Sequence, residues 1–163
     1  MTDFTTTVIL DRAPAEVFAA ILDTSSWWNE SIEGSTAGPG DEFGFEVAGL
    51  HRTRIRVTDV TPHERVEWTV VDNAFGFVQD QTEWVGNTMV FQLEPDGGGT
   101  RLTFTQHGLV PDYECYDVCS NAWGFFISDS LRNLVEAGQG KPESASADKA
   151  EVPRDEFFGS DRA

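Results

Sequence analysis

The sequence predicts an α+β fold in which an antiparallel sheet of about six strands packs against one long C-terminal helix. Two observations support this prediction. The stretch Tyr113–Ala137 carries apolar residues at helical spacing, and between Glu42 and His107 short segments of alternating apolar and polar residues follow one another at hairpin intervals. Because both patterns have one apolar face, the helix is expected to lie across the apolar face of the sheet.

The N-terminal part predicts one strand followed by short helices. Residues 4–10 are rich in Thr and β-branched side chains, which is typical of a strand. Residues 13–22 place Pro14 at a first helical position and carry an apolar face, so a short amphipathic helix is expected. Cap-type residues then precede Trp27 and Trp28, and either a second short helix or a tight turn would bury at least one of these rings.

The central part predicts a loop and five further strands. A Gly/Pro/Ser-rich loop occupies residues 34–40, and the Asp-Gly turn within residues 95–99 is the clearest hairpin signal. Residues 72–84 are open to two interpretations, a bulged strand extension or a flexible loop. The expected strands are Glu42–Val47, Arg52–Val60, Glu64–Asp72, Thr88–Glu94 and Thr100–His107.

One face of the predicted sheet is apolar and the other carries a row of arginines. Arg52, Arg54 and Arg56 alternate along one strand, and the pairing expected for the sheet places them beside Glu67 and Thr69. These arginines could hold an anionic ligand or an acidic partner. The favoured interpretation is a solvated face on which the charges balance one another.

The C-terminal residues divide into the end of the domain and a polar tail. Gly138 follows the last apolar residue of the helix, where helices often end. We therefore expect one domain over residues 1–139 and a tail over residues 140–163 whose composition is typical of disorder. Phe157 and Phe158 are predicted to dock on their own domain or on a second copy, so the protein is expected to be a monomer or a homodimer.

Charge and composition exclude several classes of partner. The net charge of −17 repels phosphate backbones and anionic lipids, so neither nucleic acid nor a membrane is an expected partner. No signal peptide or apolar stretch of about 20 residues is visible, which favours a cytoplasmic location. Cys115 and Cys119 are expected to be reduced thiols, and His51, His63 and His107 lack ligand spacing, so no metal or cofactor is expected.

Several motifs in order resemble the START-like (SRPBCC) superfamily over about residues 3–138. They are the Ala-Pro-x-x-Val-Phe helix from Ala13, the Trp-Trp pair, the Gly-Gly-Gly-Thr-Arg-Leu-Thr-Phe-Thr strand leading to His107-Gly-Leu, and Trp-Gly-Phe-Phe from Trp123 with Leu131. Within the superfamily, the chain resembles the family named after the activator of a heat-shock chaperone ATPase. This resemblance implies a helix-grip fold, in which a curved sheet wraps the last helix and leaves a deep cavity.

If such a cavity exists, strand parity and the helical stripe predict an aromatic and apolar lining. Gln106 shares parity with Leu102 and Phe104, so it is the expected inward polar group, whereas His107 should point outward. The large rings could instead fill the space completely and leave a core without a pocket. The predicted lining comprises Trp27 or Trp28 near the entrance, together with Phe45, Val57, Trp68, Phe91, Phe104, Gln106, Trp123, Phe126 and Ile127.

The sequence leaves two classes of function open and assigns no catalytic residue. The first is a carrier or sensor for a small apolar or aromatic molecule, with a chaperone- or stress-related role as the family name suggests. The second is implied by the resemblance, because related START-like proteins include polyketide cyclases and aromatase-type enzymes. It is an enzyme of the cyclase, aromatase or hydrolase-like kind acting inside the same cavity, for which Gln106, His107, Tyr113 and Glu67 are the residues to test. No nucleophile elbow, phosphate loop or dinucleotide fingerprint is present.

Overall fold

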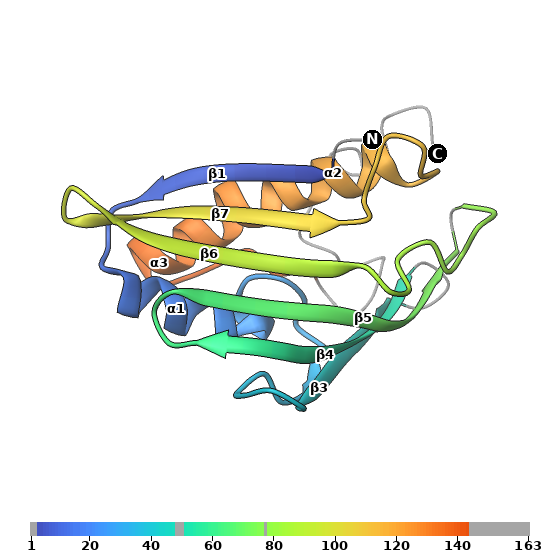
Figure 1. Ribbon diagram of the computed structural model, residues 1–163, viewed down its shortest axis with the longest axis horizontal. Coiled ribbons are helices and arrows are strands. Elements are labelled where there is room, and N and C mark those ends of the chain that lie inside the picture. The colour runs from blue at the N-terminus through green and yellow to red at the C-terminus, as the bar shows by residue number, and fades with distance from the viewer. Residues whose placement is uncertain (1–2, 48–50, 77, 144–163) are drawn as a thin grey trace.

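The computed structural model of the protein describes residues 3–47, 51–76 and 78–143, and its architecture confirms the α+β prediction (Figure 1). Within these residues a seven-stranded antiparallel sheet has the order β1-β7-β6-β5-β4-β3-β2. The strands are β1 (Phe4–Leu10), β2 (Glu33–Gly34), β3 (Glu42–Val47), β4 (His51–Thr61), β5 (Arg65–Phe75), β6 (Thr88–Asp96) and β7 (Gly99–His107). The helices are α1 (Pro14–Leu22), the 3₁₀ turn η1 (Thr24–Ser26), α2 (Tyr116–Phe125), the π segment η2 (Phe126–Leu131) and α3 (Arg132–Ala137).

The sheet has one strand more than the sequence predicts. The extra strand, β2, has only two residues, and it pairs Glu33 with Gly44 and Gly34 with Phe43. Two residues are too few to produce an alternating pattern, and the expected loop indeed begins at Gly34. The segment left open at residues 72–84 divides in two, because β5 continues to Phe75 and a series of turns follows.

Backbone geometry confirms the hairpin expected at the Asp-Gly turn. Asp96 pairs with Gly99, so the loop consists of Gly97 and Gly98, whose φ angles of 56° and 91° are both positive. Two consecutive positive φ angles suit the twist of a two-residue hairpin and are natural for glycine. The turn predicted at residues 48–50 lies outside the described residues.

The C-terminal helix is continuous but not uniform. It starts at Tyr116 rather than at Tyr113, and a π segment separates α2 from α3. Such segments often occur at functional sites. Gly138, with φ of 84°, terminates the helix as the sequence predicts. In Figure 1 the helix runs along one face of the curved sheet, which is the helix-grip arrangement.

The core lies between this helix and the sheet. On α1, Val17 and Ile21 face inward and are fully buried. The short element expected after α1 is the 3₁₀ turn η1, and it delivers Trp27 into the core, where the indole Nε1 donates to the Ile21 carbonyl at 3.2 Å. Ser130 of the π segment donates to the carbonyl of Trp27 at 2.7 Å, and this bond ties the helix to η1.

Candidate functional site

Four tryptophans form a row through the interior between the sheet and the C-terminal helix. Trp68 of β5 stacks on Trp28, with ring centroids 6.0 Å apart and planes 5° from parallel. Trp28 contacts Trp123 of α2 at 5.0 Å, and Trp123 stacks on Trp84 at 6.1 Å and 13°. We call these four side chains the indole row. Each of them is at most 3% exposed.

Phenylalanine rings surround the indole row. Phe91 and Phe104 lie opposite each other on β6 and β7, with centroids 4.9 Å apart, and Phe104 lies 4.4 Å from Trp123. On the other side, Phe45 contacts Trp28 at 5.1 Å. Tilted and edge-to-face contacts in this distance range are the favourable arrangements for aromatic rings. The interior is therefore a continuous aromatic surface shared by sheet and helix.

All residues of the predicted lining are buried, and none is more than 6% exposed. Trp27 and Trp28, one of which was expected near an entrance, are 0% and 3% exposed, because η1 turns the chain inward and both rings pack within the core. The rings contact one another across the interior, so a ligand could enter only if some of them moved apart. The residues concerned are Trp27, Trp28, Phe45, Val57, Trp68, Phe91, Phe104, Gln106, Trp123, Phe126 and Ile127.

A chain of three hydrogen bonds joins the indole row to the loop before α2. Trp123 Nε1 donates to Gln106 Oε1 at 2.8 Å, and Gln106 Nε2 donates to Asn87 Oδ1 at 2.9 Å. Asn87 Nδ2 then donates to the Tyr113 hydroxyl at 3.0 Å. Because an indole N–H can only donate, it fixes the orientation of both amides. Gln106 points inward as predicted, but both ends of its amide are already engaged.

Two buried donors have no acceptor among the described residues. They are the indole Nε1 atoms of Trp68 and Trp84, at the two ends of the indole row. The Trp84 N–H does lie close enough to Cys119 to oppose the rise in the pKa of that thiol, a rise caused mainly by burial. Sulfur is a weak acceptor, so this contact is only a partial substitute for a hydrogen bond to oxygen.

Trp84 and Asn87 were missed by sequence reasoning. Both lie in the irregular turn between β5 and β6, which the hydrogen bond from Asn87 N to the Trp84 carbonyl closes at 2.8 Å. A large indole in a polar, glycine-containing loop was the one available signal for Trp84, since such a ring is seldom left exposed. No pattern marked Asn87.

His51 is a third residue whose position among the core rings the sequence does not reveal. Its ring packs against Phe45, Phe75 and Trp84 at 4.9, 4.6 and 5.5 Å and hydrogen-bonds the Thr53 hydroxyl. The residue as a whole remains partly exposed, but desolvation by burial among these rings lowers the pKa of His51 to about 3. The ring is therefore neutral at physiological pH.

The residues considered for catalysis do not converge. Glu67 lies on the outer face, where it accepts hydrogen bonds from Thr58 at 2.7 Å and Arg65 at 3.0 Å. These bonds, with that from Thr58 the larger contribution, lower the pKa of Glu67. His107 points outward as predicted and lies 3.0 Å from Asp3.

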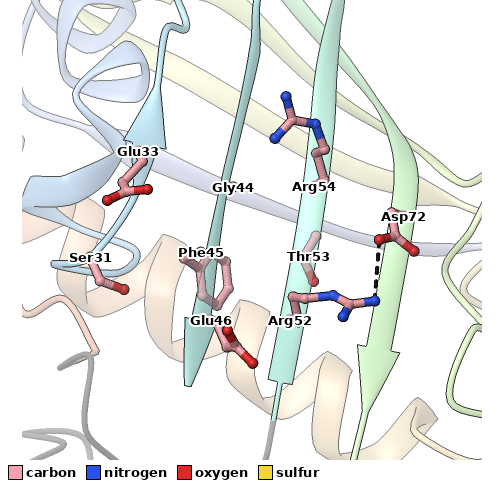
Figure 2. A pocket seen from close by; sticks show the side chains of 9 residues that line it. All are labelled: Ser31, Glu33, Gly44, Phe45, Glu46, Arg52, Thr53, Arg54 and Asp72. Atoms are coloured by element: carbon pink, nitrogen blue, oxygen red, sulfur yellow. Dashed lines mark hydrogen bonds and ion pairs between the residues drawn. The ribbon is translucent and has the colours of Figure 1, made fainter. Parts of the chain in front are cut away.

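The outer face carries paired charges and an open groove of about 570 Å³ (Figure 2). Arg54 and Arg56 both bind Glu42, at 2.7 and 2.8 Å, and Arg52 binds Asp72 at 3.2 Å. These pairs support the interpretation as a solvated, charge-balanced face. Of the two neighbours predicted for the arginines, Thr69 is confirmed, because it lies opposite Arg56. Glu67 is wrong, since it lies opposite Asp59 and Asp72 lies opposite Arg54. The groove is lined by Ser31, Glu33, Gly44, Phe45, Glu46, Arg52, Thr53, Arg54 and Asp72.

The two cysteines are free thiols inside the core. Cys115 and Cys119 are both buried free thiols, as predicted. In the part of the chain that the structure describes, no three His, Cys, Asp or Glu side chains are grouped so that they could hold a metal ion. Nor is any helix among those residues long and apolar enough to cross a membrane.

Comparison with known protein families identifies one family whose profile covers most of the chain. The profile of the family described as Activator of Hsp90 ATPase homolog 1-like protein matches residues 11–136. No curated protein sequence matches the chain.

Solved structures with the same fold include three that share 16–23% sequence identity with this chain. The Aha1 dimer from Colwellia psychrerythraea has a TM-score of 0.71 at 22% identity, covering 86% of this chain and 100% of its own. A protein from Chromobacterium violaceum has a TM-score of 0.60 at 23% identity, with 83% and 99% covered. DynU16, a protein in the dynemicin biosynthetic locus, has a TM-score of 0.60 at 16% identity, and the match covers 86% of this chain and 49% of DynU16.

Proposed function

The chain belongs to the family of Activator of Hsp90 ATPase homolog 1-like proteins, and from this premise we propose that it binds a small apolar or aromatic molecule between its curved sheet and its C-terminal helix. In general terms, the family and the helix-grip fold support a ligand-binding or cyclase-like protein. Which of these two functions applies depends on the side chains that line the interior.

The observation that carries the proposal is the indole row. Four flat rings in series, framed by phenylalanines, offer a surface on which another flat apolar molecule could stack. Because the rings contact one another without a ligand, binding requires that some of them move apart. The π segment Phe126–Leu131, which includes the inward residues Phe126 and Ile127, supports such a movement, since π segments lack the regular hydrogen-bond ladder of an α-helix.

Binding is favoured over catalysis because the candidate acid and base groups face different directions. Glu67 and His107 belong to the outer face, where each already has a charged partner. Gln106 and Tyr113 are connected through Asn87, but neither amide in that chain has an acid–base role near neutral pH. A cyclase would need titratable groups that reach the bound substrate.

Dye binding tests the proposal directly. All five tryptophans are buried in the interior, so intrinsic fluorescence reports on ligands that enter it. We expect the neutral dye N-phenyl-1-naphthylamine to bind saturably, with one dye per protein, and to quench the tryptophans. Ile127→Phe, which adds volume to the inner helix face, should weaken binding, and the outer-face control Arg54→Ala should not. A linear, non-saturating signal from the wild type would contradict the proposal.

Native mass spectrometry of protein purified from its own source gives an independent readout. We expect an additional mass in the range of a small organic molecule, which organic extraction removes. Its chemical composition would identify the ligand class.

The protein partners are a separate part of the proposal. The family is associated with activation of a chaperone ATPase, and a solved relative is described as a dimer. For this chain we propose a cytoplasmic domain over residues 1–139 that acts as a monomer or homodimer, with a chaperone as the candidate partner. Light scattering would give its mass in solution, and an unchanged ATPase rate of the chaperone on its addition would exclude the activating role.

A further inference from the structure

The two unpartnered indole donors restrict the chemistry of the ligand. Among the described residues, buried side-chain nitrogen and oxygen atoms without a hydrogen-bond partner occur only at Trp68 Nε1 and Trp84 Nε1. Both are N–H donors that cannot accept. A ligand that satisfies either of them must therefore bring an acceptor.

Trp68 is the stronger candidate of the two. Its ring is fully buried and is enclosed by Trp28, Phe43 and Phe91, with centroid distances of 6.0, 4.9 and 4.8 Å. None of these neighbours offers an oxygen acceptor from its side chain. The Trp84 N–H, by contrast, has the sulfur of Cys119 beside it.

Two other buried tryptophans do have an oxygen acceptor for their indole N–H. Trp123 Nε1 donates to Gln106 and Trp27 Nε1 donates to the Ile21 carbonyl. The fold thus supplies an oxygen acceptor to the indoles of Trp27 and Trp123, but none among the described residues to Trp68 or Trp84. Unsatisfied buried donors are rare in native proteins because each forfeits the hydrogen bond that water provides in the unfolded chain.

We propose that the ligand is a largely apolar, aromatic molecule with a carbonyl or similar oxygen acceptor, and that this oxygen accepts a hydrogen bond from Trp68 Nε1. This inference rests on the proposed function, because it assumes that the interior admits a ligand. Trp68 then selects for ligands with an acceptor, while the surrounding rings supply most of the contact surface. A pure hydrocarbon of the same shape leaves the indole N–H unsatisfied.

A matched pair of probes tests this selectivity. 2-Acetylnaphthalene carries a ketone oxygen, and 2-isopropylnaphthalene has nearly the same shape without it. Burial of apolar surface alone favours the hydrocarbon, since an unpaired ketone is costly to desolvate. We expect the ketone to bind about tenfold more tightly to the wild type, in line with one hydrogen bond gained in a buried site.

Three variants locate the effect. Trp68→Phe should abolish the preference for the ketone, whereas the outer-face variant Arg54→Ala, which leaves the interior unchanged, should preserve it. A preference that survives in Trp68→Phe but is lost in Trp84→Phe would overturn the assignment to Trp68. Circular dichroism checks that each variant is folded.

Nuclear magnetic resonance of the wild type makes the test independent of whether Trp68→Phe folds. Each of the five tryptophans contributes one indole N–H signal, and we expect the signal of Trp68 to move downfield with the ketone and much less with the hydrocarbon. Equal binding of both probes without this shift would overturn the inference and leave the proposed function intact. Absence of binding by either probe, and by the dye, would overturn both.

Discussion

The two faces of the same strands behave as different environments. Along β4, Ile55 and Val57 point into the aromatic interior and are fully buried, while Arg54 and Arg56 point outward and share Glu42. The alternation of side chains along a strand makes this separation unavoidable. The inner face excludes water and depends on ring packing, and the outer face consists of charge pairs that remain in contact with solvent.

Because of this contrast, the two faces are expected to contribute unequally to the stability of the fold. Burial of large rings contributes several kcal/mol per side chain, whereas exposed ion pairs contribute about 0–1 kcal/mol each. A sheet with this division can change its outer charges freely but depends on each interior ring.

Removal of the central indole should cause the largest loss. Trp123→Ala deletes the ring contacts with Phe104, Trp28 and Trp84 together with the hydrogen bond to Gln106. We expect the free energy of unfolding in urea to fall by about 3–5 kcal/mol. Asn121→Ala, an exposed position on the same helix, is the matched control and should change it by less than about 0.5 kcal/mol.

Replacement of the buried amide of Gln106 should cause the second largest loss of stability. Gln106→Leu retains the approximate volume but leaves Trp123 Nε1 and Asn87 Oδ1 without partners. Each unsatisfied group costs about 1–3 kcal/mol, so we expect a total loss of about 2–4 kcal/mol in urea unfolding. In the double variant Gln106→Leu/Trp123→Phe the indole donor is also absent, and the loss should be smaller than the sum of the single losses. Strict additivity would show that the hydrogen bond contributes nothing.

The alternating pattern accounts for how much of the inner face was predictable. Trp68, Phe91 and Phe104 follow from strand parity, and Trp123 follows from helical spacing, because burial imposes these two periods directly on the sequence. Parity also placed Gln106 inside and His107 outside. The two-residue strand β2 was not predictable, since it is shorter than either period.

The positions that sequence reasoning missed depend on contacts distant in the chain. Trp84 and Asn87 are held in place by the partners Trp123 and Gln106, which no local pattern can indicate. Whether the interior is a filled core or contains a pocket is also not predictable from local patterns. It depends on the separation of sheet and helix and on side-chain rotamers, neither of which the sequence of apolar and polar residues encodes.

The partly buried His51 should make the protein sensitive to acid. Because the pKa of His51 is lowered to about 3 in the folded protein, the unfolded chain binds a proton first as pH falls below about 6.5. The contribution of neutral His51 is therefore complete above pH 6.5 and is lost progressively between pH 6.5 and about 3. We expect a decline of up to about 1.4 kcal/mol per pH unit from this group.

Urea unfolding at several pH values checks this expectation. In His51→Gln the decline between pH 6.5 and 4 should be shallower than in the wild type, and in the exposed control His63→Asn it should be unchanged. A wild-type profile that is flat over this range would show that the His51 ring is readily protonated in the folded state.

The outer face should give the smallest effect, and one that salt removes. Arg56 and Arg54 lower the pKa of Glu42, so its contribution is present above the ordinary value of 4.5 and is lost as pH falls through the lower folded value. Glu42→Gln should slightly lower the urea midpoint at neutral pH and low salt. The difference should disappear in 1 M salt, where the screening length is about 3 Å. Glu33→Gln, which removes an exposed carboxylate with no ion pair among the described residues, is the control. A loss from Glu42→Gln as large as that from Gln106→Leu would mean that the outer charges stabilise the sheet as strongly as its interior does, and the contrast between the two faces would then be wrong.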